Sequence, residues 1–145
     1  MRKILSSIGA LILLSAGVAA ASPSPTVVTP DKVTWMAGTG LMSGAQIAVL
    51  NGDPTKPGPY TIRLKLPANT TLGPHFHGDT ENVTVISGSL WVGLGDSVDQ
   101  SKLMQLPAGS YASIPQGVHH YAVTKEETVV QLDGNGPFTM TAVKP

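Results

Sequence analysis

Residues 69–88 read NTTLGPHFHGDTENVTVISG, and this stretch holds two of the chain's four histidines, His75 and His77. Side chains two residues apart on a strand face the same way, so the two imidazoles share one side. Glu81 has the same parity, but on a straight strand it would lie about 20 Å from His75, at ~3.3 Å per residue. Ligands of one metal must approach it within about 2.0–2.2 Å. The chain must therefore turn between His77 and Glu81, and the Gly-Asp pair that follows His77 favours such a turn.

Two histidines and one carboxylate around a point form the facial arrangement of mononuclear iron sites that use oxygen. An isolated His-x-His also occurs by chance, so the rest of the chain must decide whether this one holds a metal. A second stretch, residues 109–124, reads GSYASIPQGVHHYAVT and contains the other two histidines, His119 and His120.

The body of the chain is typical of short strands joined by turns. Residues 60–66 alternate, with Ile62, Leu64 and Leu66 on one face, which predicts a half-buried strand. The 16 glycines and 12 prolines interrupt the 145 residues too often for a helical bundle. Residues 96–102 are expected to form a short helix or a long loop. The other predicted strands are 46–50, 83–86, 90–94, 103–106, 110–114, 120–124, 128–132 and 138–143.

Together the two histidine stretches resemble the two motifs of the cupin superfamily. The first motif is Gly, five residues, His-x-His, three or four residues, Glu, six residues, Gly; it is matched here from Asn69, which replaces the first glycine, to Gly88. The second is Gly, five residues, Pro-x-Gly, two residues, His, three residues, Asn; it is matched from Gly109 to Thr124, which replaces the asparagine. The resemblance covers residues 46–143.

This resemblance implies a fold and a metal site. The fold is an all-β double-stranded β-helix, a cupin-like jelly-roll barrel, over residues 46–145, after an extended segment and edge strand at 22–45. The cofactor is one divalent transition metal, with iron, manganese or nickel favoured and zinc as the alternative. Its implied ligands are His75, His77, Glu81 and His120.

The choice between His119 and His120 follows from their positions. The motif spacing from Gly117 selects His120, and strand alternation then points His119 away, toward the rim of the site. Several aromatic side chains are candidates to line a pocket, with plain packing as the alternative for each. They are Trp91, Tyr111 and Tyr121.

Two functions of different class fit such a site. One is a metal-dependent oxidoreductase or dioxygenase acting on a small organic molecule, with Glu81 as a base. The other is a non-catalytic protein that binds a metal or a small ligand, because a fold does not determine a function. Nine basic and nine acidic residues argue against a nucleic-acid partner. The resemblance also implies a homodimer paired through residues 33–36, for which an ordinary edge strand is the alternative.

Residues 1–21 have the three parts of a secretory signal peptide. Arg2 and Lys3 precede an uncharged run at 4–20, which ends in small residues. A membrane anchor is the alternative, but the run is short for a span. We expect cleavage near Ala20 or Ala21, a bacterial periplasmic or secreted location, and no membrane contact afterwards. The chain has no cysteine, which excludes disulfides and thiolate ligands.

Overall fold

The alternating stretch at 60–66 forms strand β3 (Gly58–Leu66) in the computed structural model, which describes residues 24–144. Ile62, Leu64 and Leu66 are at most 5% exposed, so they face the interior as predicted. Strand β3 pairs antiparallel with β2 (Gln46–Asn51) on one side and with β10 (Thr128–Gly136) on the other. These three strands form the centre of the larger sheet.

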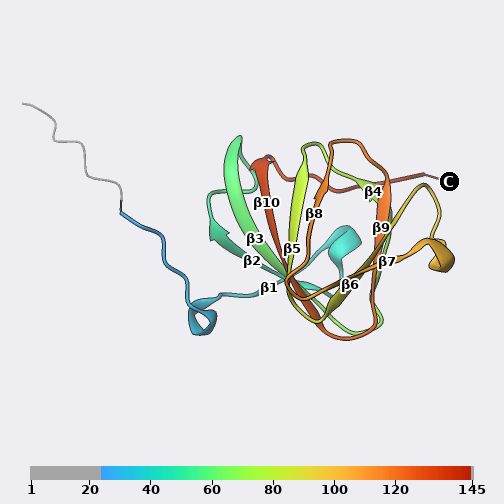
Figure 1. Ribbon diagram of the computed structural model, residues 1–145. Coiled ribbons are helices and arrows are strands. Elements are labelled where there is room, and N and C mark those ends of the chain that lie inside the picture. Colours follow the sequence, from blue (N-terminus) through green and yellow to red (C-terminus); the bar gives the residue numbers. More distant parts are fainter. Residues whose placement is uncertain (1–23, 145) are drawn as a thin grey trace, which may run out of the picture.

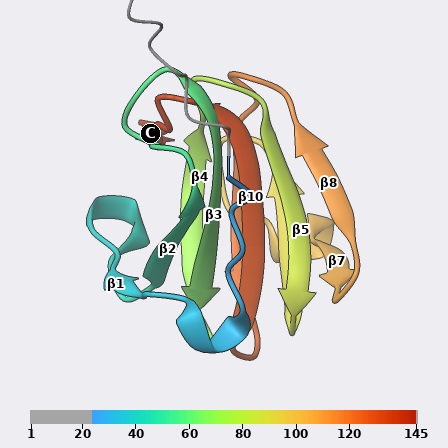
Figure 2. The ribbon, with the colours of Figure 1, turned by 90° about the vertical axis from the view of Figure 1, so that its left-hand side faces the viewer.

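Two antiparallel sheets face each other to form the barrel (Figure 1). The larger has the order β1-β2-β3-β10-β5-β8, and the smaller has the order β11-β4-β9-β6-β7. Figure 2 views the larger sheet with the N-terminal part of the described chain, in blue, lying in front of it. The remaining strands are β1 (Met36–Ala37), β4 (Thr71–Phe76), β5 (Glu81–Ser87), β6 (Ser89–Leu94), β7 (Met104–Pro107), β8 (Tyr111–Ile114), β9 (His120–Thr124) and β11 (Thr141–Ala142). The all-β jelly-roll expectation is confirmed.

Helical structure in residues 24–144 is limited to three short 3-10 turns: η1 (Pro30–Lys32), η2 (Gly40–Met42) and η3 (Gln100–Lys102). The turn η3 lies in the segment expected to be a short helix or long loop. No helix among these residues has the length and apolar character needed to cross a membrane. The predicted signal peptide at 1–21 lies outside the described residues.

Three segments differ from the strand prediction. Strand β4 was not predicted, since a Gly-Pro pair interrupts it; its register with β9 shifts between Leu72 and His75. The strand predicted at 138–143 is reduced to β11, because Phe138 and Thr139 contact His77 instead of pairing with a neighbouring strand. Of the candidate dimer segment at 33–36, only Met36 joins a strand, and it pairs with Ile47 of the same chain.

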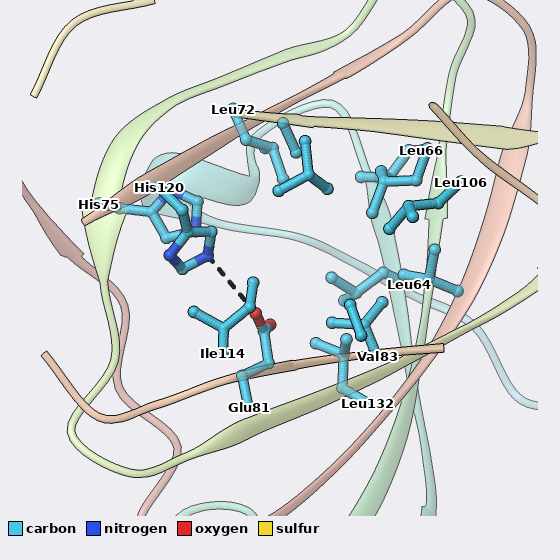
Figure 3. A pocket seen from close by; sticks show the side chains of 15 residues that line it. Leu64, Leu66, Leu72, His75, Glu81, Val83, Leu106, Ile114, His120 and Leu132 are labelled. Atoms are coloured by element: carbon cyan, nitrogen blue, oxygen red, sulfur yellow. Dashed lines mark ion pairs between the residues drawn. The ribbon is translucent and has the colours of Figure 1, made fainter. Parts of the chain in front are cut away.

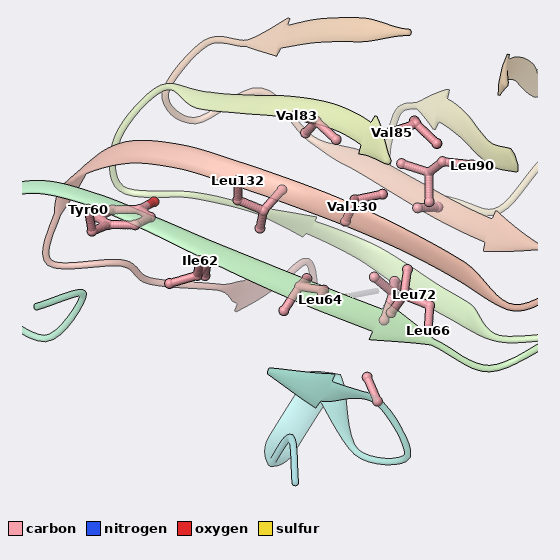
Figure 4. Packing of buried hydrophobic residues seen from close by; sticks show 12 residues of the cluster. Tyr60, Ile62, Leu64, Leu66, Leu72, Val83, Val85, Leu90, Val130 and Leu132 are labelled. Atoms are coloured by element: carbon pink, nitrogen blue, oxygen red, sulfur yellow. The ribbon is translucent and has the colours of Figure 1, made fainter. Parts of the chain in front are cut away.

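Aliphatic side chains from both sheets fill the space between them (Figure 4). The buried cluster is Ala45, Tyr60, Ile62, Leu64, Leu66, Leu72, Val83, Val85, Leu90, Ala122, Val130 and Leu132. The wall around the candidate site is therefore apolar. Any polar group placed inside it needs a partner there.

The two departures from the cupin motifs meet at the turn that leads into β4: Asn69 lies in this turn, and Thr124, the last residue of β9, contacts it. Asn69 has a φ of 59°, the left-handed conformation that asparagine tolerates better than most residues. The Thr124 hydroxyl donates to the Pro67 carbonyl at 2.6 Å and accepts from the Thr70 amide at 3.0 Å. Thr124, 1% exposed, thus ties β9 to the turn before the strand that carries His75.

Replacing this hydroxyl should destabilise the protein. Thr124→Val keeps the shape of the side chain but leaves the Pro67 carbonyl and the Thr70 amide without this partner, a loss of about 1–3 kcal/mol. Urea unfolding measures the change in the free energy of unfolding. Thr71→Val, on the exposed side of β4, is the matched control and should change it by less than about 0.5 kcal/mol. Equal effects of the two variants would contradict the role of the Thr124 hydroxyl.

Candidate metal centre

Three histidines from the smaller sheet meet inside the barrel. His75 lies in β4 and pairs in register with His120, the first residue of β9, while His77 directly follows β4. Each of the three is 3% exposed. Their ring centroids lie 4.2 Å (His75 to His120), 5.1 Å (His75 to His77) and 5.2 Å (His77 to His120) apart. One nitrogen from each ring lies within 4.8 Å of the other two.

Every imidazole in this cluster binds a backbone carbonyl through Nδ1. The His75, His77 and His120 Nδ1 atoms lie 2.7, 2.6 and 3.0 Å from the carbonyl oxygens of Gly73, Thr139 and Val118. A carbonyl only accepts hydrogen bonds, so each Nδ1 must carry the proton. In a neutral ring, Nε2 is then left with a free lone pair, as in histidines that bind a metal.

Glu81 completes the cluster from the opposite sheet. It is the first residue of β5, and residues 77–80 make the turn that the spacing required. Its Oε1 lies 3.5 Å from Nε2 of His77, and its Oε2 lies 3.4 Å from Nε2 of His120. Figure 3 shows the Glu81 carboxylate directed at the imidazoles, with the His120 ion pair dashed. His77 Nε2 has no hydrogen-bond partner among the described residues, although it is buried.

Burial and mutual contact shift the pKa values of these groups. Burial lowers the pKa of His75 to about 4, so this ring is neutral at pH 7. Burial alone would lower the pKa of His120, but its contacts with the Glu81 carboxylate and the Val118 carbonyl outweigh burial and raise it. Burial alone would raise the pKa of Glu81, but the neighbouring His120 and His77 outweigh burial and lower it. The carboxylate is thus held in its charged form.

A small cavity of about 40 Å³ opens beside the cluster. His75, Glu81 and His120 form one end of it, and aliphatic side chains such as Leu72, Ile114 and Leu132 form the rest (Figure 3). The site is therefore a polar cluster at the edge of an apolar space. Three imidazole nitrogens and one carboxylate form a donor set that suits a divalent transition metal.

His119 lies on the other side of β9, as alternation predicted. Its Nδ1 lies 2.6 Å from Oδ1 of Asp96, and its ring stacks on Phe76 at 5.2 Å. Its side chain is 38% exposed. It does not join the other three imidazoles.

The three aromatic candidates do not line the cavity, and that expectation is corrected. Tyr111 is 63% exposed and donates a hydrogen bond to Asn82. The ring of Trp91 lies under the Lys125 ammonium, 3.6 Å from its centroid. Tyr121 is fully buried, but it neighbours His120 and so faces away from the cavity; its hydroxyl donates to the Asp99 carbonyl. Strand alternation turns each of these side chains away from the cavity.

Sequence reasoning missed two residues of the site, Phe138 and Thr139. The Phe138 ring stacks on His77 with centroids 5.3 Å apart, and the Thr139 carbonyl accepts the His77 Nδ1 proton. Both follow the second motif, and Thr139 is 62 residues from His77. No pattern in the sequence marks them.

Comparison with known proteins supports the same architecture. The model of a family described as the ChrR cupin-like domain matches residues 23–139. The polyketide cyclase RemF from Streptomyces resistomycificus is similar with a TM-score of 0.66 at 18% identity, over 84% of this chain and 87% of that one. A proposed acetylacetone dioxygenase from Methylibium petroleiphilum PM1 is similar with a TM-score of 0.66 at 17% identity, over 87% of this chain and 85% of that one.

A chain in the complex of Rhodobacter sphaeroides SigE with the anti-sigma ChrR is similar with a TM-score of 0.55 at 17% identity. That match covers 74% of this chain and 52% of the other. No curated protein sequence matches this chain. At these identities the solved structures show a shared fold and no more.

The depressed pKa of His75 predicts that the metal-free protein loses stability as the pH falls from 6.5 toward 4.5. The unfolded chain takes up a proton near the ordinary value of 6.5, whereas the folded chain resists it until about pH 4. The contribution of His75 to the free energy of unfolding is thus fully present above pH 6.5 and falls by up to about 1.4 kcal/mol per pH unit below it. The raised pKa of His120 acts above this window, and the lowered pKa of Glu81 acts below 4.5.

Urea unfolding at several pH values between 6.5 and 4.5 measures this slope. His75→Gln, which does not titrate there, is the control and should flatten it. The same slope in both proteins would assign the pH dependence to other groups.

Proposed function

The chain belongs to the ChrR cupin-like domain family, and on that premise we propose that it is an exported, single-domain metalloprotein. It holds one divalent transition metal through His75, His77, Glu81 and His120. It acts as a metal-dependent oxidoreductase or dioxygenase on a small organic molecule. The observation that carries the proposal is the arrangement of the imidazoles: each has Nδ1 on a backbone carbonyl, and the Nε2 atoms of His77 and His120 lie within 3.5 Å of the Glu81 carboxylate.

The energetics of burial support a metal at this point. The four residues are at most 6% exposed, and an apolar wall surrounds them. A buried polar atom without a partner costs about 1–3 kcal/mol, and the Nε2 atom of His77 is such an atom among the described residues. A bound cation would pair with this nitrogen and with the Glu81 carboxylate together.

The donor set also fits redox chemistry. When bound, a redox-active divalent metal with four protein ligands supplies a Lewis-acidic centre with up to two open positions for substrate and dioxygen. Glu81, held charged by its histidine neighbours, can accept a proton from the substrate. The aliphatic wall excludes water from the reacting groups. Iron, manganese or nickel suits this role, and zinc would limit the site to non-redox chemistry.

The size of the cavity favours a second candidate, metal or ligand binding without turnover. The cavity of about 40 Å³ is far below the roughly 300–1,000 Å³ of a typical small-molecule pocket. The similar ChrR is an anti-sigma factor seen in complex with SigE, so one protein of this fold acts by binding.

A homodimer is also part of the proposal. It would pair through the edge strand that contains Met36, whose side chain is exposed.

Export is proposed from the sequence of residues 1–21. The basic start, the uncharged run and the small residues before Ser22 are the parts of a cleavable signal. Cleavage near Ala20 or Ala21 would place the mature protein in a bacterial periplasm or outside the cell. Removal of Arg2 and Lys3 would leave seven basic and nine acidic residues, a balance that gives no reason to expect a nucleic-acid partner there.

Metal content of the protein purified from the periplasmic fraction, without chelator or histidine tag, tests the site. Wild-type protein should carry about one metal ion per chain, and its intact mass should correspond to cleavage near Ala20 or Ala21. His120→Ala should retain much less metal through purification, because one of the four donors is gone. His119→Ala is the matched control from the adjacent position and should retain it. Equal metal content in the two variants would contradict the assignment.

Oxygen uptake separates the two candidate functions. With a redox metal bound, wild-type protein should consume oxygen with some member of a panel of small organic molecules, beginning with acetylacetone. Glu81→Gln keeps the size of the side chain but removes its basicity, so the rate should fall by about 100-fold or more. Metal binding without uptake of oxygen across the panel would favour the binding role.

A further inference from the structure

The C-terminal segment, residues 137–143, lies beside the histidine cluster. It begins at the end of β10 and reaches β11, which pairs with β4 through Thr141 to Phe76 and Ala142 to His75. The Val143 amide then donates to the Pro74 carbonyl at 2.9 Å. The segment is thus joined to the strand that carries His75 and ends just before His77.

His77 differs from the other two imidazoles in how its ring is oriented. His75 and His120 bind carbonyls only two residues before them, Gly73 and Val118, so the backbone just before each ring orients it. His77 binds the carbonyl of Thr139, which is 62 residues away in the C-terminal segment. One of the three nitrogen donors therefore depends on a part of the chain that lies outside both histidine stretches.

Thr139 holds the chain around His77 at two points. Its carbonyl lies 2.6 Å from Nδ1 of His77, and its hydroxyl accepts from the Gly78 amide at 2.9 Å. A Cβ on Gly78 would lie 2.7 Å from this hydroxyl, which is closer than real Cβ contacts allow. The glycine after His77 is what allows the segment to approach this closely.

Phe138 holds the ring of His77 from its face. The two rings are 25° from parallel, with centroids 5.3 Å apart. On its other side Phe138 meets Tyr60 edge-on at 5.8 Å, and its amide donates to the Pro54 carbonyl at 2.7 Å. The ring of His77 is thus held between an aromatic face and a carbonyl acceptor, and both belong to the C-terminal segment.

We propose that the C-terminal segment positions His77 as a metal ligand, through the ring of Phe138 and the carbonyl of Thr139, and so controls metal affinity. This inference rests on the proposed function, because it requires that the cluster binds a metal. Removing the groups that orient a metal-binding histidine weakens metal affinity by about 10–100-fold. We expect a loss of that size when the contact with Phe138 is removed.

Binding of Co(II) alone to the metal-free, full-length mature protein tests the inference, by chelator competition and by the visible spectrum of the bound ion. Phe138→Ala should weaken Co(II) binding about 10–100-fold and alter the spectrum. Phe138→Tyr retains an aromatic face and should restore most of the affinity. Met140→Ala is the control from the same segment, since Met140 packs on the hydrophobic core. Circular dichroism confirms that each variant is folded at the temperature used.

A double-mutant cycle shows whether Phe138 acts through His77. In a His77→Ala background, Phe138→Ala should cause little further loss, because the ligand that it positions is already absent. In a His120→Ala background, Phe138→Ala should cause its full loss of affinity, because the backbone just before His120, and not the C-terminal segment, orients that ring.

Each other outcome has a definite meaning. Wild-type affinity in Phe138→Ala, an equal loss in Met140→Ala, or an undiminished loss in the His77→Ala background would overturn the positioning role while leaving the metal site intact. A wild-type protein without affinity for Co(II) would overturn the proposed metal site, and this inference with it.

Discussion

The organisation of the site depends on one constraint: polar ring nitrogens inside an aliphatic barrel must each have a partner. Three backbone carbonyls satisfy the three Nδ1 atoms, and this leaves the Nε2 side of each ring for the centre of the cluster. Glu81 then brings a negative charge to the same centre from the opposite sheet. The fold thus produces an electron-rich point that a cation would complete, and its apolar wall makes that point costly to leave without one.

This constraint explains why the site lies where both sheets and the C-terminal segment meet. Strands β4 and β9 belong to the smaller sheet, β5 belongs to the larger, and Thr139 lies between β10 and β11. The donors come from two separate stretches of the sequence and from both sheets, so the cluster exists only in the folded chain. A metal bound there would therefore add its binding free energy to the stability of the fold.

Much of this could be predicted from the sequence, because local rules govern it. Alternation predicted the inward face of β3, and the spacing of His75, His77 and Glu81 required a turn that the structure contains. The same alternation places His119 away from the cluster. The Phe138 and Thr139 contacts could not be predicted, because they depend on the path of a segment between two sheets, which no periodicity encodes. Alternation also turns Trp91 and Tyr111 away from the cavity, but which face of their strands points inward becomes visible only in the structure.

Burial of the cluster connects access with metal retention. Since its four residues are at most 6% exposed, a substrate can reach it only when some covering segment moves. Strands β3 and β10 are paired along nine residues, whereas β11 is paired along two, and segments with few hydrogen bonds open at the lowest free energy. Among the strands beside the cluster, β11 has the shortest pairing, and it belongs to the segment that orients His77. Movement of this segment would loosen the contacts that orient His77 as a ligand. A barrel of this kind therefore cannot both open readily to a substrate and hold its metal tightly, and an enzyme built on it must balance the two.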